Sequence, residues 1–132
     1  MKNESLQSMK RIKLQGMAAA YEAILGLPIN QQPSAHDMIA RLIDAEAQHR
    51  SQRRTELFLR LSKLRYQATI VDIECSESRN LMPEQLALLA DSAYIERGEN
   101  LLITGATGCG KSYLACAQGN QACVLGLRTL YF

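Results

Sequence analysis

The sequence predicts an α-helical N-terminal module followed by the opening strand–loop–helix–strand of an α/β domain. Two observations support this fold class. Apolar residues recur at three- and four-residue spacing through the first half of the chain, which is typical of helices with one buried face. Near residue 98 the pattern changes to a short apolar run, a glycine-rich loop and a further helical pattern. We therefore expect a helical module over residues 1–95 and an incomplete α/β domain over residues 96–132.

The first predicted helix is followed by a break and then by a much longer helix. Its apolar stripe consists of Leu14, Met17, Tyr21, Ile24 and Leu25. Pro28 and Pro33 end this pattern, because proline does not continue a helix and restricts the residue before it. Ser34, with Asp37 three residues later, indicates a new helix start. We expect this second helix to extend from Ala35 to about Gln67, as one helix or as two with little break.

The central part of the chain predicts less regular structure. Residues 68–82 show no clear period. A short helix is expected from Pro83 to about Ala90, since proline is favoured in the first turn. Residues 96–99 are typical of a turn.

The last 33 residues contain the elements that indicate an α/β domain. Residues 100–104 are short and apolar, as expected for a strand buried on both faces of a parallel sheet. A helix should begin at Lys111 and end near Leu125, with Gly126 just past its C-terminus. Residues 127–132 then predict a second strand.

Charge is distributed unevenly along the chain. The 132 residues carry a net charge of +2, but residues 48–65 contain six basic side chains and one acid. Such a concentrated block is typical of a surface that faces a polyanion, with non-specific DNA as our hypothesis. A solvated helix face, or a surface for an acidic partner, explains the same charge. The candidate DNA contacts are Arg50, Arg53, Arg54, Arg60, Lys63 and Arg65.

Several classes of protein are disfavoured by the same sequence. No run of 18 apolar residues is present, so we expect no transmembrane helix and no membrane partner. The first residues lack the apolar region of a secretory signal. The four cysteines, at positions 75, 109, 116 and 123, match neither a zinc site nor a compact disulfide framework. We expect a reduced, cytoplasmic protein.

The strongest chemical signal is a glycine-rich segment that matches the P-loop pattern G-x-x-x-x-G-K-S/T without a gap. Its glycines allow the backbone to turn its N–H groups toward phosphate oxygens. Lys111 is expected to reach the β- and γ-phosphates of a nucleotide, and the Ser112 hydroxyl to bind Mg²⁺. The predicted nucleotide-binding residues are Gly105, Ala106, Thr107, Gly108, Cys109, Gly110, Lys111 and Ser112. Because Cys109 lies inside this loop, we also hypothesise that oxidants block nucleotide binding through its thiol.

Three segments together resemble a known family, the IstB-like ATPases, which are helper proteins of bacterial insertion sequences related to the helicase loader DnaC. These segments are Lys13-Leu14-Gln15-Gly16-Met17, the arginine-rich helix, and Ile95-Glu96-Arg97-Gly98-Glu99-Asn100-Leu101-Leu102 before the P-loop. The resemblance covers essentially the whole chain. It implies an AAA+ ATPase that uses ATP and Mg²⁺, assembles on target DNA, self-associates and assists a transposase. It also implies that residues 1–95 form the module that contacts DNA and other subunits.

The sequence also departs from that family. Only 27 residues follow Gly105, so the acidic Walker B strand, the sensor residue and the arginine finger of an AAA+ core have no counterpart. The chain therefore resembles the N-terminal part of a family member, and we expect it to bind ATP without hydrolysing it alone. Two alternatives stay open: a DnaC-like helicase loader, and a non-hydrolysing DNA-binding or assembly module.

Overall fold

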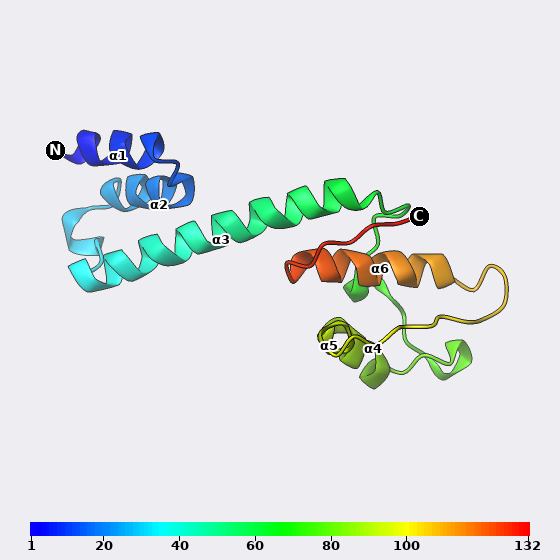
Figure 1. Ribbon diagram of the computed structural model, residues 1–132. Helices are drawn as coiled ribbons and strands as arrows, with labels where there is room; N and C mark the ends of the chain where they lie inside the picture. Colours follow the sequence, from blue (N-terminus) through cyan, green and yellow to red (C-terminus); the bar gives the residue numbers. More distant parts are fainter. The chain divides into compact units, whose positions relative to one another are not determined.

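The computed structural model describes residues 1–132, and its regular secondary structure consists of helices only (Figure 1). The chain divides into two compact units, Met1–Arg54 and Thr55–Phe132. The division falls inside the long helix α3 (Ala35–Ser62). The predicted boundary between functional modules near residue 95 stays a prediction.

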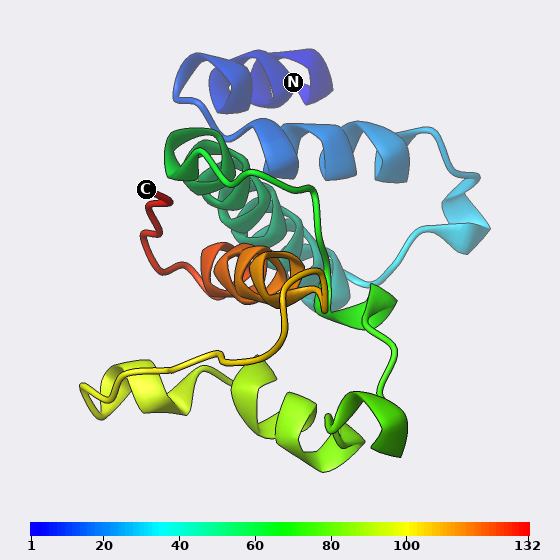
Figure 2. The same ribbon diagram turned by 90° about the vertical axis from the view of Figure 1, so that its right-hand side faces the viewer.

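The first unit contains α1 (Lys2–Arg11), α2 (Gln15–Leu25), the short 3-10 helix η1 (Ile29–Gln31) and most of α3. The sequence pattern predicted α2 but did not single out α1 as a separate helix. Lys13, between α1 and α2, has a φ of 66°. This left-handed residue reverses the chain, so that α1 and α2 lie side by side (Figures 1 and 2).

A close contact joins α2 to α3 in this unit. A Cβ atom on Gly16 would lie 2.6 Å from both the Ala45 carbonyl oxygen and the His49 Cβ, so only glycine fits there. The Met17 N–H next to it donates a 2.9 Å hydrogen bond to Glu46 Oε2. The Glu46 side chain, which also pairs with Arg50 at 3.0 Å, is therefore buried between the two helices.

The long helix begins as predicted but ends earlier. The Asp37 N–H donates to Ser34 Oγ at 3.3 Å, which confirms the predicted N-terminal cap. The helix ends at Ser62 rather than near Gln67, because Lys63 takes a left-handed φ of 56° that breaks the helical hydrogen-bond series. Lys63 and Arg65 consequently lie beyond the helix.

The second unit is built around α6 (Lys111–Val124) and contains four shorter helical segments. Its small core consists of the fully buried Ala68, Cys116 and Ala117. The amide side chain of Gln118 on α6 donates to the Leu89 carbonyl and so attaches the end of α4 to this helix. The shorter segments are η2 (Ile70–Asp72), η3 (Glu77–Arg79), α4 (Pro83–Ala90) and α5 (Ala93–Glu96).

The α/β fold class predicted for residues 96–132 is wrong, because neither 100–104 nor 127–132 forms a strand. A strand exists only when a neighbouring segment accepts and donates its ladder hydrogen bonds. These two segments run along different sides of α6 and do not lie next to each other (Figures 1 and 2). Each is extended but unpaired, so the fold is helical.

The predictions of helices at Pro83 and at Lys111 are confirmed. The helix α4 has the predicted bounds, and α6 begins at Lys111 and ends one residue before Leu125. Gly126, directly beyond it, has a φ of 84° and ends the helix as expected. None of the helices is long and apolar enough to cross a membrane.

Candidate functional site

The predicted nucleotide-binding residues form one continuous loop that leads directly into α6. Thr107 and Gly108 form a turn, and the Cys109 N–H donates to the Ala106 carbonyl at 3.3 Å. Gly110 is the N-cap of α6, and Lys111 is the first helical residue. The structure therefore brings all eight predicted residues, from Gly105 to Ser112, together at one end of this helix.

Two glycines of the loop have backbone conformations that side chains strongly disfavour. Gly108 has a φ of 79° and Gly110 a φ of 93°, both in the left-handed region. These angles turn the chain from the extended segment into the first turn of α6. Glycine at these two positions is thus required by the backbone geometry of the loop, and its role toward phosphate stays a prediction.

Lys111 lies against the loop rather than extending into solvent. Its Nζ donates a hydrogen bond to the Gly105 carbonyl oxygen. This contact places a positive charge at the mouth of the loop, beside the N-terminal end of α6. An anionic ligand at this end would meet both the ammonium group and the positive end of the helix dipole.

The first amide groups of α6 are also free to bind a ligand. No carbonyl of the chain accepts a hydrogen bond from the N–H of Lys111, Ser112 or Tyr113, whereas the Leu114 N–H donates to the Gly110 carbonyl. Unpaired N–H groups at a helix start are the usual partners of bound phosphate. The Ser112 side chain is exposed at the same end.

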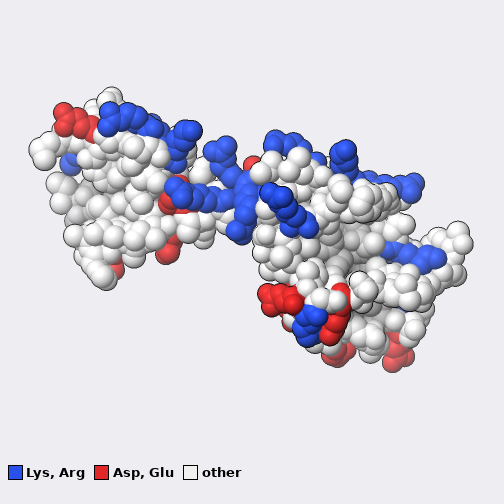
Figure 3. Space-filling view, viewed as in Figure 1, with Lys and Arg blue, Asp and Glu red and all other residues white.

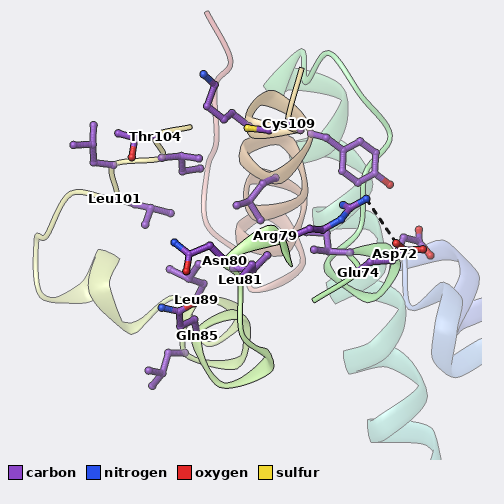
Figure 4. Close-up of a pocket in the computed structure, with 18 residues that line it drawn as sticks. Asp72, Glu74, Arg79, Asn80, Leu81, Gln85, Leu89, Leu101, Thr104 and Cys109 are labelled. Atoms are coloured by element: carbon purple, nitrogen blue, oxygen red, sulfur yellow. Dashed lines mark ion pairs between the residues drawn. The ribbon is translucent and has the colours of Figure 1, made fainter. Parts of the chain in front are cut away.

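A cavity of about 830 Å³ lies next to this loop and includes Cys109, Gly110 and Lys111 in its lining. Figure 4 shows Cys109 and Thr104 toward one end of the cavity and Gln85 and Leu89 toward the other. The volume falls within the range typical of small-molecule sites. The candidate site is therefore the loop together with the cavity beside it.

Another part of the cavity wall is both polar and charged. Arg79 and Glu74 form an ion pair with 3.7 Å between Nη2 and Oε2, visible as the dashed line in Figure 4. Asp72 lies beside them and accepts a 2.7 Å hydrogen bond from the Thr69 hydroxyl. Because Arg79 and Glu74 are both largely exposed, their ion pair is screened by water and a ligand can displace it at small cost.

The sequence analysis did not predict that residues 72–85 contribute to the cavity. Residues 68–82 were expected only to be irregular, yet Asp72, Glu74 and Arg79 line the cavity, as does Gln85 on α4. A left-handed residue, Asn80 with a φ of 53°, turns the chain between η3 and α4. No motif marks these positions, because they meet the P-loop only through the folding of some thirty intervening residues.

An ion pair lies in the turn at residues 97–99, directly before the extended segment 100–104. Arg97 donates from Nε and Nη2 to the two carboxylate oxygens of Glu99, each at 2.9 Å. This pairing lowers the pKa of Glu99 and raises that of Arg97, with the mutual hydrogen bonds as the main cause. Both side chains are more than half exposed and neither lines the cavity, so this ion pair contributes little to stability and does not form part of the site.

The predicted DNA-contacting residues divide between the two units. Arg50, Arg53 and Arg54 share one turn of α3 in the first unit, where Figure 3 shows basic side chains standing out from this helix. Arg50 is paired with the buried Glu46, whereas Arg53 and Arg54 are exposed and form no ion pair. Arg53 and Arg54 are therefore the free cations of this turn.

The remaining three basic residues lie in the second unit. Arg60 is on α3, and Lys63 and Arg65 follow its end, so they do not continue the helical face that the sequence predicted. The Arg65 guanidinium lies 5.3 Å from the ring centroid of Tyr66, a cation–π distance. The Arg65 guanidinium therefore already has a partner within the chain, the ring of Tyr66.

No protein-only metal site accompanies the loop, since no cluster of three or more His, Cys, Asp or Glu side chains could hold an ion. The four cysteines are free thiols, with Cys109 exposed and Cys116 and Cys123 buried. A divalent ion near α6 would therefore need ligands from a bound nucleotide as well as from the Ser112 hydroxyl.

A glycine-containing loop at a helix start, beside a cavity, offers main-chain N–H groups and a positive helix end of the kind that bind phosphate groups. The family model described as IstB-like ATP binding protein matches residues 7–132. The chain belongs to this family.

Individual relatives agree with this assignment. A Pseudomonas fluorescens protein, named for insertion sequence IS1162 and ATP binding, is 36% identical over 99% of this chain and 57% of its own length. A Sinorhizobium fredii protein named for an insertion sequence and ATP binding is 36% identical over 93% of this chain and 50% of its own. A Geobacillus stearothermophilus protein, named for insertion sequence IS5376 and ATP binding, is 28% identical over 99% and 52%. The chain thus spans about half the length of these relatives.

Proposed function

We propose that this chain binds ATP at the loop Gly105–Ser112 in the service of DNA transposition. The carrying observation is the position of this loop, which joins free helix N-terminal amides and Lys111 to a cavity of nucleotide size. The triphosphate would accept hydrogen bonds from these amides. Lys111 would exchange its bond to the Gly105 carbonyl for a phosphate oxygen.

The charges and apolar residues of the cavity favour one orientation of the bound nucleotide. Lys111 is the cation at the loop, where the phosphates belong, while Asp72 and Glu74 outweigh the single Arg79 on the wall that they share and give it a net negative charge that would repel phosphates. Carboxylates instead accept hydrogen bonds from ribose hydroxyls. The apolar side chains of Leu81 and Leu89, with the amide of Gln85 beside them, form a surface on which a base can rest.

Mg²⁺ belongs to the same proposal. Ser112 directly follows Lys111 and presents an exposed hydroxyl at the end of α6. Mg²⁺ prefers oxygen ligands and usually combines one or two protein ligands with phosphates and water. The Ser112 hydroxyl fits that role when ATP supplies the phosphate oxygens.

The decisive test is a titration of fluorescent ATP with Mg²⁺ against the wild-type chain and its Lys111→Ala variant. Loss of a charge-assisted hydrogen bond should weaken binding by about 1.5–3 kcal/mol, or roughly ten- to a hundredfold. Lys10→Ala, which removes an exposed lysine on α1, is the matched control and should bind like the wild type. Equal affinity of the wild type and Lys111→Ala would refute the proposal.

A hydrogen-exchange footprint tests the proposed orientation separately. ATP should slow amide exchange in residues 79–89 and 109–114, whereas inorganic triphosphate should slow it only in 109–114. Protection of residues 109–114 alone by both ligands would place the whole nucleotide at the loop and leave the cavity unused, and protection of 79–89 by triphosphate as well would contradict the proposed orientation.

We further propose that Arg53 and Arg54 contact the DNA backbone. The supporting observation is that both are exposed, adjacent and free of ion pairs. Such contacts give sequence-independent binding that weakens with salt. Arg50, which is held by Glu46, would contribute less than the other two.

The DNA proposal is tested by fluorescence anisotropy with a labelled duplex over a salt series. Reversing both charges, Arg53→Glu with Arg54→Glu, should weaken binding and reduce the salt slope by about one for each lost phosphate contact. Arg41→Glu, also exposed on α3 but outside the basic turn, is the control. Unchanged DNA affinity in the double variant would favour a solvated face or an acidic protein partner.

Assistance to a transposase and self-association on DNA are the parts of this proposal that rest on the family alone. A pull-down with the cognate transposase, with and without ATP, distinguishes this role from that of a helicase loader, which would instead retain a replicative helicase. Retention of neither, with DNA binding intact, would favour the non-hydrolysing DNA-binding module.

A further inference from the structure

Two tyrosines from distant parts of the sequence meet beside the first turn of α6. The ring centroids of Tyr66 and Tyr113 lie 6.2 Å apart, and the ring planes are inclined by 44°. Tyr66 follows the end of α3, and Tyr113 is the third residue of α6. The two side chains remain 39% and 36% exposed. Because neither ring is buried, the pair leaves aromatic surface that a ligand can contact.

A guanidinium group extends this aromatic surface. Arg65 lies over the ring of Tyr66, with 5.3 Å between its Cζ and the ring centroid. The guanidinium and the two tyrosine rings therefore form a set of three neighbouring planar groups. Nucleic-acid bases stack both on aromatic rings and on arginine guanidinium planes. A flat, unpaired base is the kind of ligand that this surface fits.

The segment that carries Tyr66 is also strongly basic. Arg60, Lys63 and Arg65 are all exposed, and none of them forms an ion pair. No Asp or Glu occurs between Glu56 and Asp72. Positive charges that are close together and have no acid among them attract phosphate groups. Groups that can stack on a base and groups that can bind phosphate are thus combined in one short segment.

This segment is held in place at both of its ends. At one end the Ser62 carbonyl accepts a 2.8 Å hydrogen bond from the Tyr131 N–H, and the left-handed Lys63 turns the chain out of α3. At the other end Ala68 is fully buried in the core of the second unit. A surface that is fixed before its ligand arrives loses less conformational entropy on binding than a flexible one.

We propose that Arg65, Tyr66 and Tyr113 bind an unpaired base of single-stranded DNA, while Arg60 and Lys63 contact the neighbouring phosphates. The base must be unpaired and unstacked, because inside a duplex its faces are covered by the neighbouring base pairs. The site is separate from the duplex contacts proposed for residues 53 and 54. It does not depend on ATP binding.

The test uses the full chain and two fluorescein-labelled strands of equal length and charge, an oligothymidylate and a strand of abasic sites. Binding is measured by fluorescence anisotropy. Stacking of one base should make the wild type bind the thymidine strand about fivefold or more tightly than the abasic strand. Tyr66→Leu should abolish this preference with an unchanged affinity for the abasic strand and an unchanged circular dichroism spectrum. Tyr66→Phe, which keeps the ring, should retain the preference. No preference in the wild type, or an equal preference in Tyr66→Leu, would overturn the proposal.

The phosphate contacts are tested by a salt series with the same two strands. Arg60→Gln combined with Lys63→Gln should weaken both strands equally and should reduce the salt slope by about 0.7 for each lost contact. Lys2→Gln combined with Arg41→Gln removes two exposed charges from the first unit and is the matched control, with an unchanged slope expected. A wild-type slope in the variant at residues 60 and 63 would overturn the assignment of these phosphate contacts.

The base of a bound nucleotide and an acidic protein are the competing ligands for this surface. Tyr113 also lines the nucleotide cavity whereas Tyr66 does not, so Tyr66→Leu should keep the ATP affinity of the wild type. Weaker ATP binding with an unchanged preference between the two strands would overturn the proposal and assign the ring pair to the nucleotide. Displacement of the thymidine strand by an oligoglutamate peptide as readily as by unlabelled thymidine strand would overturn it in favour of an acidic protein partner.

Discussion

The two compact units of this chain satisfy their main-chain hydrogen bonds in different ways. In Met1–Arg54 the helices α1, α2 and α3 pair most N–H and C=O groups within themselves, and helix contacts such as Gly16 against Ala45 hold them together. In Thr55–Phe132 two extended segments, 101–104 and 128–130, leave such groups unpaired. The first of these segments lines the candidate nucleotide cavity.

This difference has a physical origin. A helix closes its hydrogen bonds within four residues, so a local sequence pattern is enough to indicate where one can form. A strand requires a partner that the neighbouring sequence does not supply. The first unit therefore pairs most of its main-chain groups internally, while the second contains extended segments whose main-chain groups are unpaired.

The largest expected difference between the units is in amide hydrogen exchange. Amides of α2 and of α3 within the first unit should be protected at least about a hundredfold more than those of residues 101–104, which are free to exchange from the native state. Exchange measured residue by residue by NMR tests this. Protection of 101–104 equal to that of α6 would mean that these amides have partners, which would remove the contrast between the units.

The same contrast explains which parts of the fold were predictable. The bounds of α4 follow from Pro83 and a local apolar pattern, and those of α6 from the glycines that flank it. The two predicted strands failed because a short apolar run gives no information about what lies beside it. Residues 100–104 have a strand-like sequence and an extended conformation, but no partner.

Substitution at Gly16 should have the next largest effect and should be confined to one unit. Gly16→Ala places a methyl group 2.6 Å from the Ala45 carbonyl, which should lower the free energy of unfolding of the first unit by about 1–3 kcal/mol. Gly26→Ala is the matched control, since its Cβ would meet only ordinary contacts at 3.5 Å and its φ of −74° suits alanine.

Urea denaturation and ATP titration of both variants test this prediction together. We expect Gly16→Ala to unfold at lower urea concentration and to retain the ATP affinity of the wild type, because the nucleotide cavity lies wholly in the second unit. A parallel loss of ATP affinity would contradict the independence of the two units.

Chemical modification of the loop should have a smaller effect. Cys109 is exposed, whereas Cys116 and Cys123 are buried and protected from reagents. The Cys109 Sγ lies 2.8 Å from where a Cβ on Gly105 would be, so an added oxygen would crowd the loop. Mild peroxide should lower ATP affinity by about tenfold. Equal oxidant sensitivity of the Cys109→Ala variant would show that another residue is responsible.

The candidate site was predictable to the extent that it is contiguous. Gly105–Ser112 form one segment, so their spacing alone indicated a phosphate-binding loop. Arg79 and Gln85 line the same cavity as the loop because the chain turns at Asn80. Sequence spacing gives no information about contacts between segments that are brought together in this way. The basic residues between 50 and 65 were predicted to lie on one helix face. Lys63 and Arg65 do not lie on it, because α3 ends at Ser62.

The smallest expected effect concerns the carboxylate that joins α2 to α3. The pKa of Glu46 is held below its ordinary value of 4.5, first by the hydrogen bond from the Met17 N–H and then by Arg50, with burial opposing both. The ionised form therefore stabilises the folded first unit. That stabilisation is fully present above pH 4.5 and is lost as the pH falls through the lowered folded-state pKa.

Glu46→Gln should remove this dependence on acid. Glutamine still offers an oxygen to the Met17 N–H but carries no charge for Arg50, so stability near neutral pH should fall slightly and change less on acidification. The exposed Arg50 makes its contribution sensitive to salt, which keeps the effect small. Urea denaturation at neutral pH and at about pH 3 compares the variant with Glu22→Gln, an exposed control on α2. A wild-type acid response in Glu46→Gln would mean that another carboxylate controls the stability of the first unit.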